Sequence, residues 1–297
     1  MTFNAIIIGS GVAGLTAGLY LARAKKSVMI IEDSVLGGTT ATLDTIENYP
    51  GFQSISGFEL IQNMVMQVST LGVNIDFLNI KSIDFDKKQV ICDKKTFGYK
   101  SLIIASGTSY NKLNLPEEDS FKFRGLSYCA VCDGNLYKNK TIVVVTSGMT
   151  GASSIEYLSN LTDCLIVVDK SGDYANLDKF HMTNKNIKVY SNAEVKQILG
   201  KSHVEGIEIT NENNKITKIN CDAIFVSLGK HSDLRLYKDK IKCSDMHILS
   251  DENMHTNLEG VFVAGDIREK SLRQIVTACA DGAIAGTEAI KYIQSLK

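Results

Sequence analysis

The feature that most constrains this chain is a pattern that occurs twice. Each copy has an apolar strand, a short turn with Gly or Ser, a helix, and a second apolar strand that ends in an acid. In each copy the acid lies 23 positions after the first residue of the turn, from Gly9 to Glu32 and from Thr146 to Asp169. Continuous Ile/Val runs suit strands of a parallel sheet that is covered on both faces. The pattern predicts an α/β fold with two doubly wound, Rossmann-like domains.

The order of the remaining segments indicates that one domain is inserted into the other. The chain has 297 residues, which is enough for two domains. Pro116 lies in a polar stretch that suits a linker, and the strand at residues 260–266 with the helix after it closes the chain. We therefore expect an outer domain of residues 1–114 and 243–297 and an inserted domain of residues 115–242.

Composition excludes several classes of protein. Lys and Arg number 32 against 33 Asp and Glu, which argues against a nucleic-acid-binding protein. Seven cysteines without the spacing of a secreted scaffold favour a reducing compartment. No apolar run reaches the roughly 18 to 20 residues of a membrane span, and the N-terminus enters a strand without a basic leader. We expect a soluble cytoplasmic protein with no nucleic-acid or membrane partner.

The first turn has the pattern of a dinucleotide-binding motif. It consists of Gly9, Ser10, Gly11, Val12, Ala13 and Gly14. Gly9 permits the tight turn, Gly11 lets the backbone approach a pyrophosphate, and Gly14 lets the helix pack on the strand. The helix N-terminus then offers N–H groups to the phosphates, and Glu32 is placed to accept a hydrogen bond from a ribose 2′-OH. The alternative is a glycine-rich turn that binds no ligand.

A CxxC motif precedes the second copy of the pattern. Cys129 and Cys132 have the spacing of a small disulfide ring, in which one thiolate is activated and the other resolves. The alternative is half of a zinc or iron–sulfur site, but the other five cysteines are scattered singly, so we predict no metal. Asp133 follows directly and could carry the proton of thiol chemistry. Alternatively, Asp133 caps a helix or stabilises a turn.

With these motifs the sequence resembles the low-molecular-weight thioredoxin reductases over almost its whole length. The resemblance also includes Gly37-Gly38, Glu47-Asn48-Tyr49-Pro50-Gly51-Phe52, Ile103-Ile104-Ala105-Ser106-Gly107, Gly260-Val261-Phe262-Val263-Ala264-Gly265-Asp266 and Arg273-Gln274. It implies a homodimer that reduces thioredoxin, with Cys132 facing the flavin and Cys129 attacking the thioredoxin disulfide. It also implies that FAD binds the outer domain, while the inserted domain is pyridine-nucleotide-domain-like and carries the CxxC motif.

The resemblance assigns further residues to the FAD site. Asp266 is expected to hold the ribitol, and Arg273 and Gln274 are expected near the isoalloxazine. Thr39 stands where the family usually has glutamine, which alters one side-chain contact to the flavin. The expected FAD residues outside the first turn and Glu32 are Gly37, Gly38, Thr39, Asn48, Ser106, Gly107, Gly265, Asp266, Arg273, Gln274 and Ile275.

The second turn departs from the NADPH pattern of the family. Thr146 replaces the first glycine, and Val168-Asp169-Lys170 replaces the usual His-Arg-Arg. An acid at position 169 would repel a 2′-phosphate, and no arginine lies between Arg124 and Arg235. This pattern resembles the ferredoxin-dependent flavin thioredoxin reductases, so we expect ferredoxin as electron donor. One alternative is a reductase that still uses NADH or NADPH although the sequence of its nucleotide site has drifted. The other is a redox-inert flavin-binding regulatory protein, which the intact CxxC disfavours.

Overall fold

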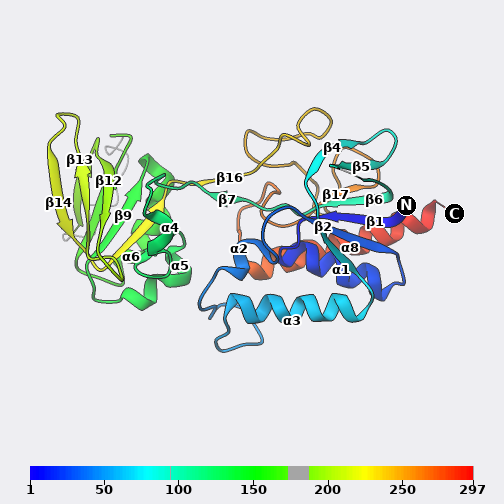
Figure 1. Cartoon of the computed structure of the whole chain (residues 1–297), viewed down its shortest axis with the longest axis horizontal. Coiled ribbons are helices and arrows are strands. Elements are labelled where there is room, and N and C mark those ends of the chain that lie inside the picture. The colour runs from blue at the N-terminus through cyan, green and yellow to red at the C-terminus, as the bar shows by residue number, and fades with distance from the viewer. Residues whose placement is uncertain (94, 173–186, 297) are drawn as a thin grey trace. The chain divides into compact units, whose positions relative to one another are not determined.

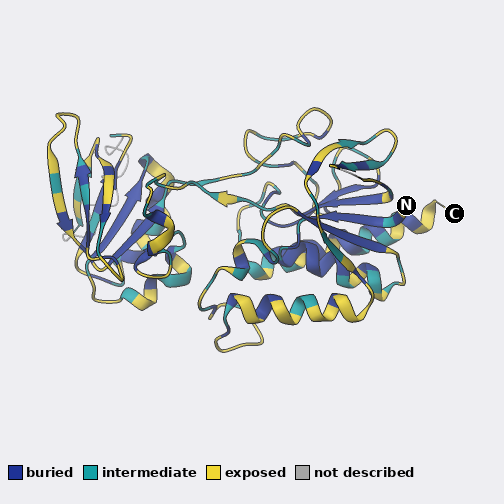
Figure 2. Ribbon diagram, in the orientation of Figure 1, coloured by how far each residue is buried: buried dark blue, intermediate teal, exposed yellow. Residues whose placement is uncertain are grey.

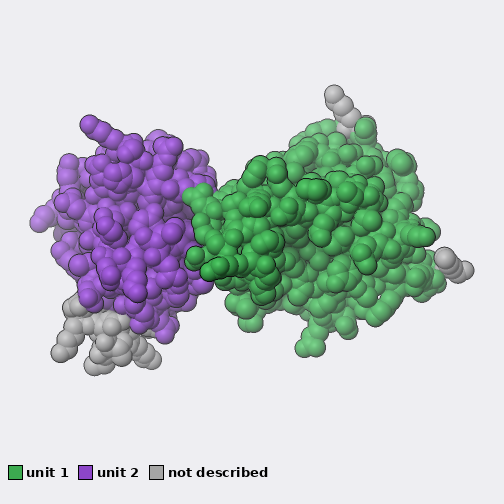
Figure 3. Space-filling model, turned by 90° about the horizontal axis from the view of Figure 1, so that it is seen from below, with its two compact units in different colours: residues 1–109, 231–297 green, residues 110–230 purple. Residues whose placement is uncertain are grey.

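The computed structural model describes residues 1–93, 95–172 and 187–296. The chain divides into two compact units, residues 1–109 with 231–297 (unit 1) and residues 110–230 (unit 2), coloured in Figure 3. The divisions lie earlier than the expected 114/115 and 242/243. The second differs most because Tyr237 and Ile241 are each 2% exposed within a hydrophobic cluster of unit 1. The strands at the two crossings, β7 (Ser109–Tyr110) and β16 (Lys230–His231), pair with each other.

The described part of unit 1 is built on a seven-stranded sheet in the order β3-β2-β1-β6-β5-β4, with β17 also paired to β6. The strands are β1 (Thr2–Ile8), β2 (Val28–Glu32), β3 (Asn74–Phe77), β4 (Ile80–Asp84), β5 (Gln89–Cys92), β6 (Thr96–Ile104) and β17 (Val261–Val263). One edge of β6 is shared: its first half pairs antiparallel with β5 and its second half parallel with β17. Strands β1, β2, β3, β6 and β17 are parallel, so their carboxyl ends share one edge of the sheet.

Alternate residues of β1 enter two different cores. Ile7 packs in the core that contains α1 (Val12–Arg23), α3 (Gly57–Thr70) and α8 (Ile275–Ser295), whereas Ile6 and Ile8 pack in the core on the opposite face. That second core also contains apolar residues of β4 and β5 and of the segments around Tyr237 and Ile248. The central strands β1, β2 and β17 are almost wholly buried, and much of α3 is exposed on its outer side (Figures 1 and 2).

Unit 2 repeats this arrangement with shorter elements. Its described residues form a parallel sheet in the order β11-β10-β9-β15-β8 and an antiparallel sheet in the order β12-β13-β14. The parallel strands are β8 (Leu126–Ser127), β9 (Ile142–Thr146), β10 (Leu165–Asp169), β11 (Ile187–Ser191) and β15 (Ala223–Ser227). The antiparallel strands are β12 (Glu194–Leu199), β13 (Gly206–Thr210) and β14 (Ile216–Asn220). The helical segments are α4 (Glu118–Phe121), α5 (Ala130–Asp133), η1 (Gly134–Tyr137), η2 (Gly148–Gly151) and α6 (Ala152–Ser159).

Alternation along β9 again separates two cores. Ile142 and Val144 pack with α5 and α6, whereas Val143 and Val145 pack with the antiparallel sheet. The predicted α/β class with parallel sheets covered on both faces is therefore confirmed. Among the described residues no helix is long and apolar enough to cross a membrane.

Candidate active site

The first glycine turn, at the carboxyl end of β1, is fixed by close backbone packing. Gly9 has φ of +102°, and a Cβ there would lie 2.4 Å from the carbonyl oxygen of Ala105. A Cβ on Gly14 would lie 2.0 Å from the carbonyl oxygen of Gly9. Both distances are far below van der Waals contact, so a side chain at Gly9 would push the turn away from Ala105, and one at Gly14 would push the helix away from the turn. These two glycines therefore serve the fold of the turn.

Gly11 differs, because the space beside it is open. Apart from Gly11 itself and its neighbours along the chain, no heavy atom of the described residues lies within 4 Å of a Cβ built on Gly11. Gly11 is the N-cap of α1 and has no side chain to bond the first N–H groups of the helix. Gly37 donates its N–H to Ser10 Oγ at 3.1 Å, so the loop containing Gly37 and Gly38 lies beside this opening. A helix N-terminus facing open space fits the pyrophosphate of FAD.

Glu32 is 7% exposed and holds the turn in place from the end of β2. Its Oε2 accepts hydrogen bonds from the N–H and Oγ of Ser10 at 2.8 and 2.6 Å. Its Oε1 accepts from the N–H groups of Asp33 and Ser34 at 3.1 and 2.9 Å. A carboxylate accepts about four hydrogen bonds. These four N–H and O–H groups of the protein therefore already occupy the acceptor sites of Glu32 that were expected to bind the ribose 2′-OH. The ribose contact stays a prediction.

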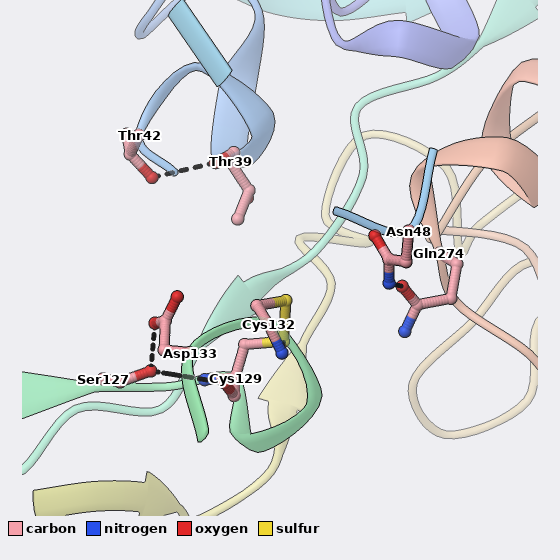
Figure 4. Close-up of a disulfide and its surroundings, with 8 residues drawn as sticks. All are labelled: Thr39, Thr42, Asn48, Ser127, Cys129, Cys132, Asp133 and Gln274. Carbon is pink, nitrogen blue, oxygen red and sulfur yellow. Dashed lines mark hydrogen bonds between the residues drawn. A yellow bond between two sulfur atoms is a disulfide. The ribbon is translucent and has the colours of Figure 1, made fainter. Parts of the chain in front are cut away.

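The residues expected near the flavin gather around the start of α8. Asn48 Nδ2 donates to Gln274 Oε1 at 3.2 Å, although the two are far apart in sequence (Figure 4). Gln274 is the N-cap of α8, and Ile275 is its first residue. Arg273 Nε donates to the carbonyl oxygen of Asp266 at 3.3 Å. The structure therefore brings Asn48, Asp266, Arg273 and Gln274 into one cluster.

The other expected FAD residues of unit 1 lie on neighbouring loops. A Cβ on Gly265 would lie 2.9 Å from the Cβ of Ala13, so the loop after β17 packs against the start of α1. Ser106 and Gly107 follow β6, and Ser106 Oγ is 3.3 Å from the hydroxyl of Tyr237. Thr39 lies in α2 (Gly38–Ala41) with an exposed side chain, and its carbonyl oxygen accepts from Thr42 Oγ1 at 2.8 Å (Figure 4).

Sequence reasoning missed a buried ion pair beneath this cluster. Lys270 Nζ lies 2.8 Å from Asp281 Oδ2 and 3.8 Å from Asp266 Oδ1, and the side chains of Lys270 and Asp281 are 6% and 7% exposed. Asp281 Oδ2 also accepts the N–H of Gly265 at 3.1 Å. The sequence did contain one indication of this pair: Asp281 is an acid among the Ala and Gly residues on the buried face of the last helix.

The CxxC motif forms a disulfide in unit 2. Cys129 and Cys132 are joined by an S–S bond with their Cα atoms 5.3 Å apart, as the redox interpretation requires (Figure 4). Cys129 is the N-cap of α5, and Cys132 N donates to Cys129 Sγ at 3.3 Å. Both cysteines therefore belong to one short helical turn.

Burial distinguishes other cysteines from this pair. It raises the pKa of the thiols of Cys92, Cys221, Cys243 and Cys279, in the case of Cys221 to about 12. A raised pKa keeps these four groups as thiols, which are poor nucleophiles at neutral pH.

Asp133 is linked to the disulfide through Ser127, a residue that sequence reasoning did not identify. Ser127 Oγ donates to Asp133 Oδ2 at 2.5 Å and accepts the N–H of Cys129 at 3.1 Å (Figure 4). Asp133 is the last residue of α5, and its own N–H donates to the carbonyl oxygen of Cys129 at 3.1 Å. A carboxylate is thus held within the same turn as the two sulfurs.

In the second turn, at the carboxyl end of β9, the side chains of Thr146 and Asp169 are packed inside the turn. Thr146 is fully buried, and a Cβ on Gly151 would lie 2.5 Å from Thr146 Oγ1. Asp169 is also fully buried and accepts the N–H of Gly148 at 2.8 Å and the hydroxyl of Ser171 at 2.9 Å.

The cation after β10 is paired with an acid. Lys170 Nζ lies 3.1 Å from Glu194 Oε1, and Glu194 Oε2 lies 2.5 Å from Lys196 Nζ. These hydrogen bonds from Lys196 and Lys170 lower the pKa of the Glu194 carboxyl. Lys170 therefore faces an ionised acid at the position where the family has its basic cluster.

Comparison with known proteins agrees with this geometry. Residues 3–282 match the family model described as "Pyridine nucleotide-disulphide oxidoreductase". Thioredoxin reductase of Treponema pallidum is 34% identical, covering 99% of this chain and 98% of that protein.

Two solved structures are also similar. Thioredoxin reductase from Streptococcus pyogenes is 33% identical, with a TM-score of 0.91 and 99% of each chain covered. A ferredoxin-flavin thioredoxin reductase from Clostridium acetobutylicum is 28% identical, with a TM-score of 0.56 and 100% and 99% coverage. The chain belongs to the pyridine nucleotide-disulphide oxidoreductases, as a flavoprotein of the low-molecular-weight thioredoxin reductase type with FAD as its cofactor.

Proposed function

We propose that this protein is a thioredoxin reductase that receives its electrons from reduced ferredoxin. The observation that carries the reductase activity is the Cys129–Cys132 disulfide, with Asp133 held beside it by Ser127. In this proposal the inserted domain presents the disulfide, the outer domain holds FAD, and the protein is a cytoplasmic homodimer. The thioredoxin reductases of Treponema pallidum and Streptococcus pyogenes support the choice of substrate.

The residues of unit 1 would hold FAD at its pyrophosphate, its ribitol and its isoalloxazine. The N-terminus of α1 at Gly11 binds the pyrophosphate, Asp266 binds the ribitol, and Asn48, Arg273 and Gln274 lie near the isoalloxazine. The bound FAD supplies the electron pair that reduces the disulfide.

Thioredoxin reduction then proceeds by thiol–disulfide exchange. The Cys129 thiolate attacks one sulfur of the thioredoxin disulfide, so that a mixed disulfide forms and one thioredoxin thiolate leaves. The Asp133 carboxylate has accepted the proton of the Cys129 thiol and gives it to that leaving thiolate. Cys132 attacks Cys129 Sγ, which restores the enzyme disulfide, and the proton of the Cys132 thiol goes to the second thioredoxin sulfur as it leaves. Two electrons and two protons have passed to thioredoxin, which leaves as a dithiol.

Three features of unit 2 support ferredoxin as the donor. The turn glycine is replaced by buried Thr146, Asp169 places a carboxylate at the ribose position, and Lys170 is paired with Glu194. A 2′-phosphate of NADPH would have to displace Glu194 from Lys170 and would meet two acids there. The similarity to the ferredoxin-flavin thioredoxin reductase of Clostridium acetobutylicum supports the same choice.

The test is an anaerobic titration of the oxidised FAD-loaded protein with NADPH, NADH and reduced ferredoxin in turn. We expect flavin absorbance to bleach with reduced ferredoxin and to persist at micromolar NADPH. As a control, the protein is reduced with dithionite and mixed with oxidised thioredoxin, which tests the disulfide exchange without any physiological donor.

The choice of electron donor and the reductase activity are contradicted by different results. Rapid bleaching by NADPH would contradict the ferredoxin assignment. Bleaching by NADH alone would favour an NADH-dependent reductase with Asp169 as ribose ligand, which the retained glycines Gly148 and Gly151 allow. If dithionite-reduced protein leaves thioredoxin oxidised, the reductase function itself is wrong.

A further inference from the structure

Ser127 occupies a central position in the hydrogen bonding around the disulfide. It is the last residue of β8 and is 6% exposed. Its hydroxyl connects the carboxylate of Asp133 with the backbone N–H of Cys129, two residues whose side chains the proposed chemistry uses (Figure 4). Strand β8 is held by parallel pairing to β15, with Ser127 opposite Phe225.

The direction of these hydrogen bonds follows from the single proton of the hydroxyl. The N–H of Cys129 can only donate, so it fixes Ser127 Oγ as its acceptor. The hydroxyl proton is then directed to Asp133 Oδ2 at 2.5 Å, since the competing carbonyl oxygen of Cys129 lies farther away at 3.4 Å. A hydrogen bond to an ionised carboxylate is stronger than one to a neutral carbonyl group, which favours the same direction.

We propose that Ser127 is a positioning residue for disulfide exchange, which holds the Asp133 carboxylate in register with the backbone of Cys129. This inference rests on the proposed function, in which Asp133 carries the proton. Without the hydroxyl, the carboxylate loses a charge-assisted bond and rotates away from the leaving thiolate. A lost bond of this kind corresponds to a rate loss of about 10- to 100-fold.

The test is a double-mutant cycle with Ser127→Ala, Asp133→Asn and the double variant. Each FAD-loaded protein is reduced with dithionite, mixed anaerobically with oxidised thioredoxin, and compared at equal FAD content. Because Ser127 acts through Asp133, we expect the double variant to be no slower than Asp133→Asn alone. Ser127→Thr, which keeps the hydroxyl, should restore most of the rate, and Ser127→Gly repeats the removal of the hydroxyl if the alanine variant fails to fold.

The control is Ser227→Ala on the neighbouring strand β15. Ser227 Oγ donates to Ser154 Oγ at 2.9 Å, so this variant removes a hydroxyl of the same unit that is bonded to a different side chain. We expect it to exchange at the wild-type rate.

Losses that multiply in the double variant, or a Thr variant as slow as Ala, would overturn the positioning role and leave the proposed function standing. An unchanged rate for Ser127→Ala beside a slow Asp133→Asn would do the same. An unchanged rate for Asp133→Asn would overturn the proton role together with the inference. Failure of thioredoxin reduction by the wild-type protein would instead contradict the proposed function.

Discussion

Gly11 and Gly14 belong to one motif, yet the structure predicts opposite consequences for their replacement by alanine. A Cβ on Gly14 would lie 2.0 Å from the carbonyl oxygen of Gly9, whereas a Cβ on Gly11 would meet no described heavy atom within 4 Å beyond its own chain neighbours. Gly14→Ala should therefore destabilise the apoprotein. Gly11→Ala should leave the apoprotein almost intact and weaken FAD binding.

The magnitudes follow from these distances. Overpacking typically lowers the free energy of unfolding by about 1–3 kcal/mol. The carbonyl oxygen of Gly9 belongs to the backbone and cannot change rotamer, so we expect Gly14→Ala to cost at least the upper end of this range. The better helix propensity of alanine offsets about 1 kcal/mol, which leaves about 2 kcal/mol or a lowering of the melting midpoint by about 4–8 °C. Gly11 has φ of −63° and ψ of 175°, which alanine adopts easily, so its cost is about 0.5–1 kcal/mol at the N-cap.

FAD binding is the second measurement. The added methyl group of Gly11→Ala would stand between the pyrophosphate and the N-terminus of α1. Loss of one charge-assisted hydrogen bond costs about 1.5–3 kcal/mol, which weakens FAD binding by roughly 10- to 100-fold.

The assay is thermal unfolding of both apoproteins, followed by titration of each with FAD. Wild-type FAD affinity in Gly11→Ala would show that the open space is not the pyrophosphate site. A wild-type melting midpoint in Gly14→Ala would refute the packing argument for the turn.

Three further predictions concern the chemistry and the buried charges. Cys132→Ser should trap a stable mixed disulfide between Cys129 and thioredoxin on a non-reducing gel; trapping only by Cys129→Ser would reverse the roles of the two cysteines. Asp133→Asn should slow exchange with thioredoxin by about 10²–10⁴-fold while keeping its FAD, and an exchange rate unchanged across pH would reduce Asp133 to a turn residue. Lys270→Met should lower the free energy of unfolding in urea by about 1.5–3 kcal/mol, because it removes the 2.8 Å partner of the buried Asp281 carboxylate and leaves Arg268 at 3.4 Å as its cation, and an unchanged midpoint would count against that pairing.

The amino-acid sequence by itself determined the features that depend on short-range order. The strand, turn and helix of each motif follow from the Ile/Val runs and the glycines, and the pairing of Cys129 with Cys132 follows from their spacing. Such features are predictable because the residues concerned are close along the chain and their backbone conformations depend mainly on neighbours.

The tertiary structure decided which distant groups meet. Asn48 meets Gln274, 226 positions along the chain, only because the fold brings the N-cap of α8 to it, and Lys170 meets Glu194 only through the packing of β10 near β12. Glu32 bonds the Ser10 turn, and residues 231–242 belong to unit 1 because Tyr237 and Ile241 are buried there. Hydrogen bonds and ion pairs of this kind depend on strand order and on the directions of individual side chains. A local pattern of residues carries no information about either.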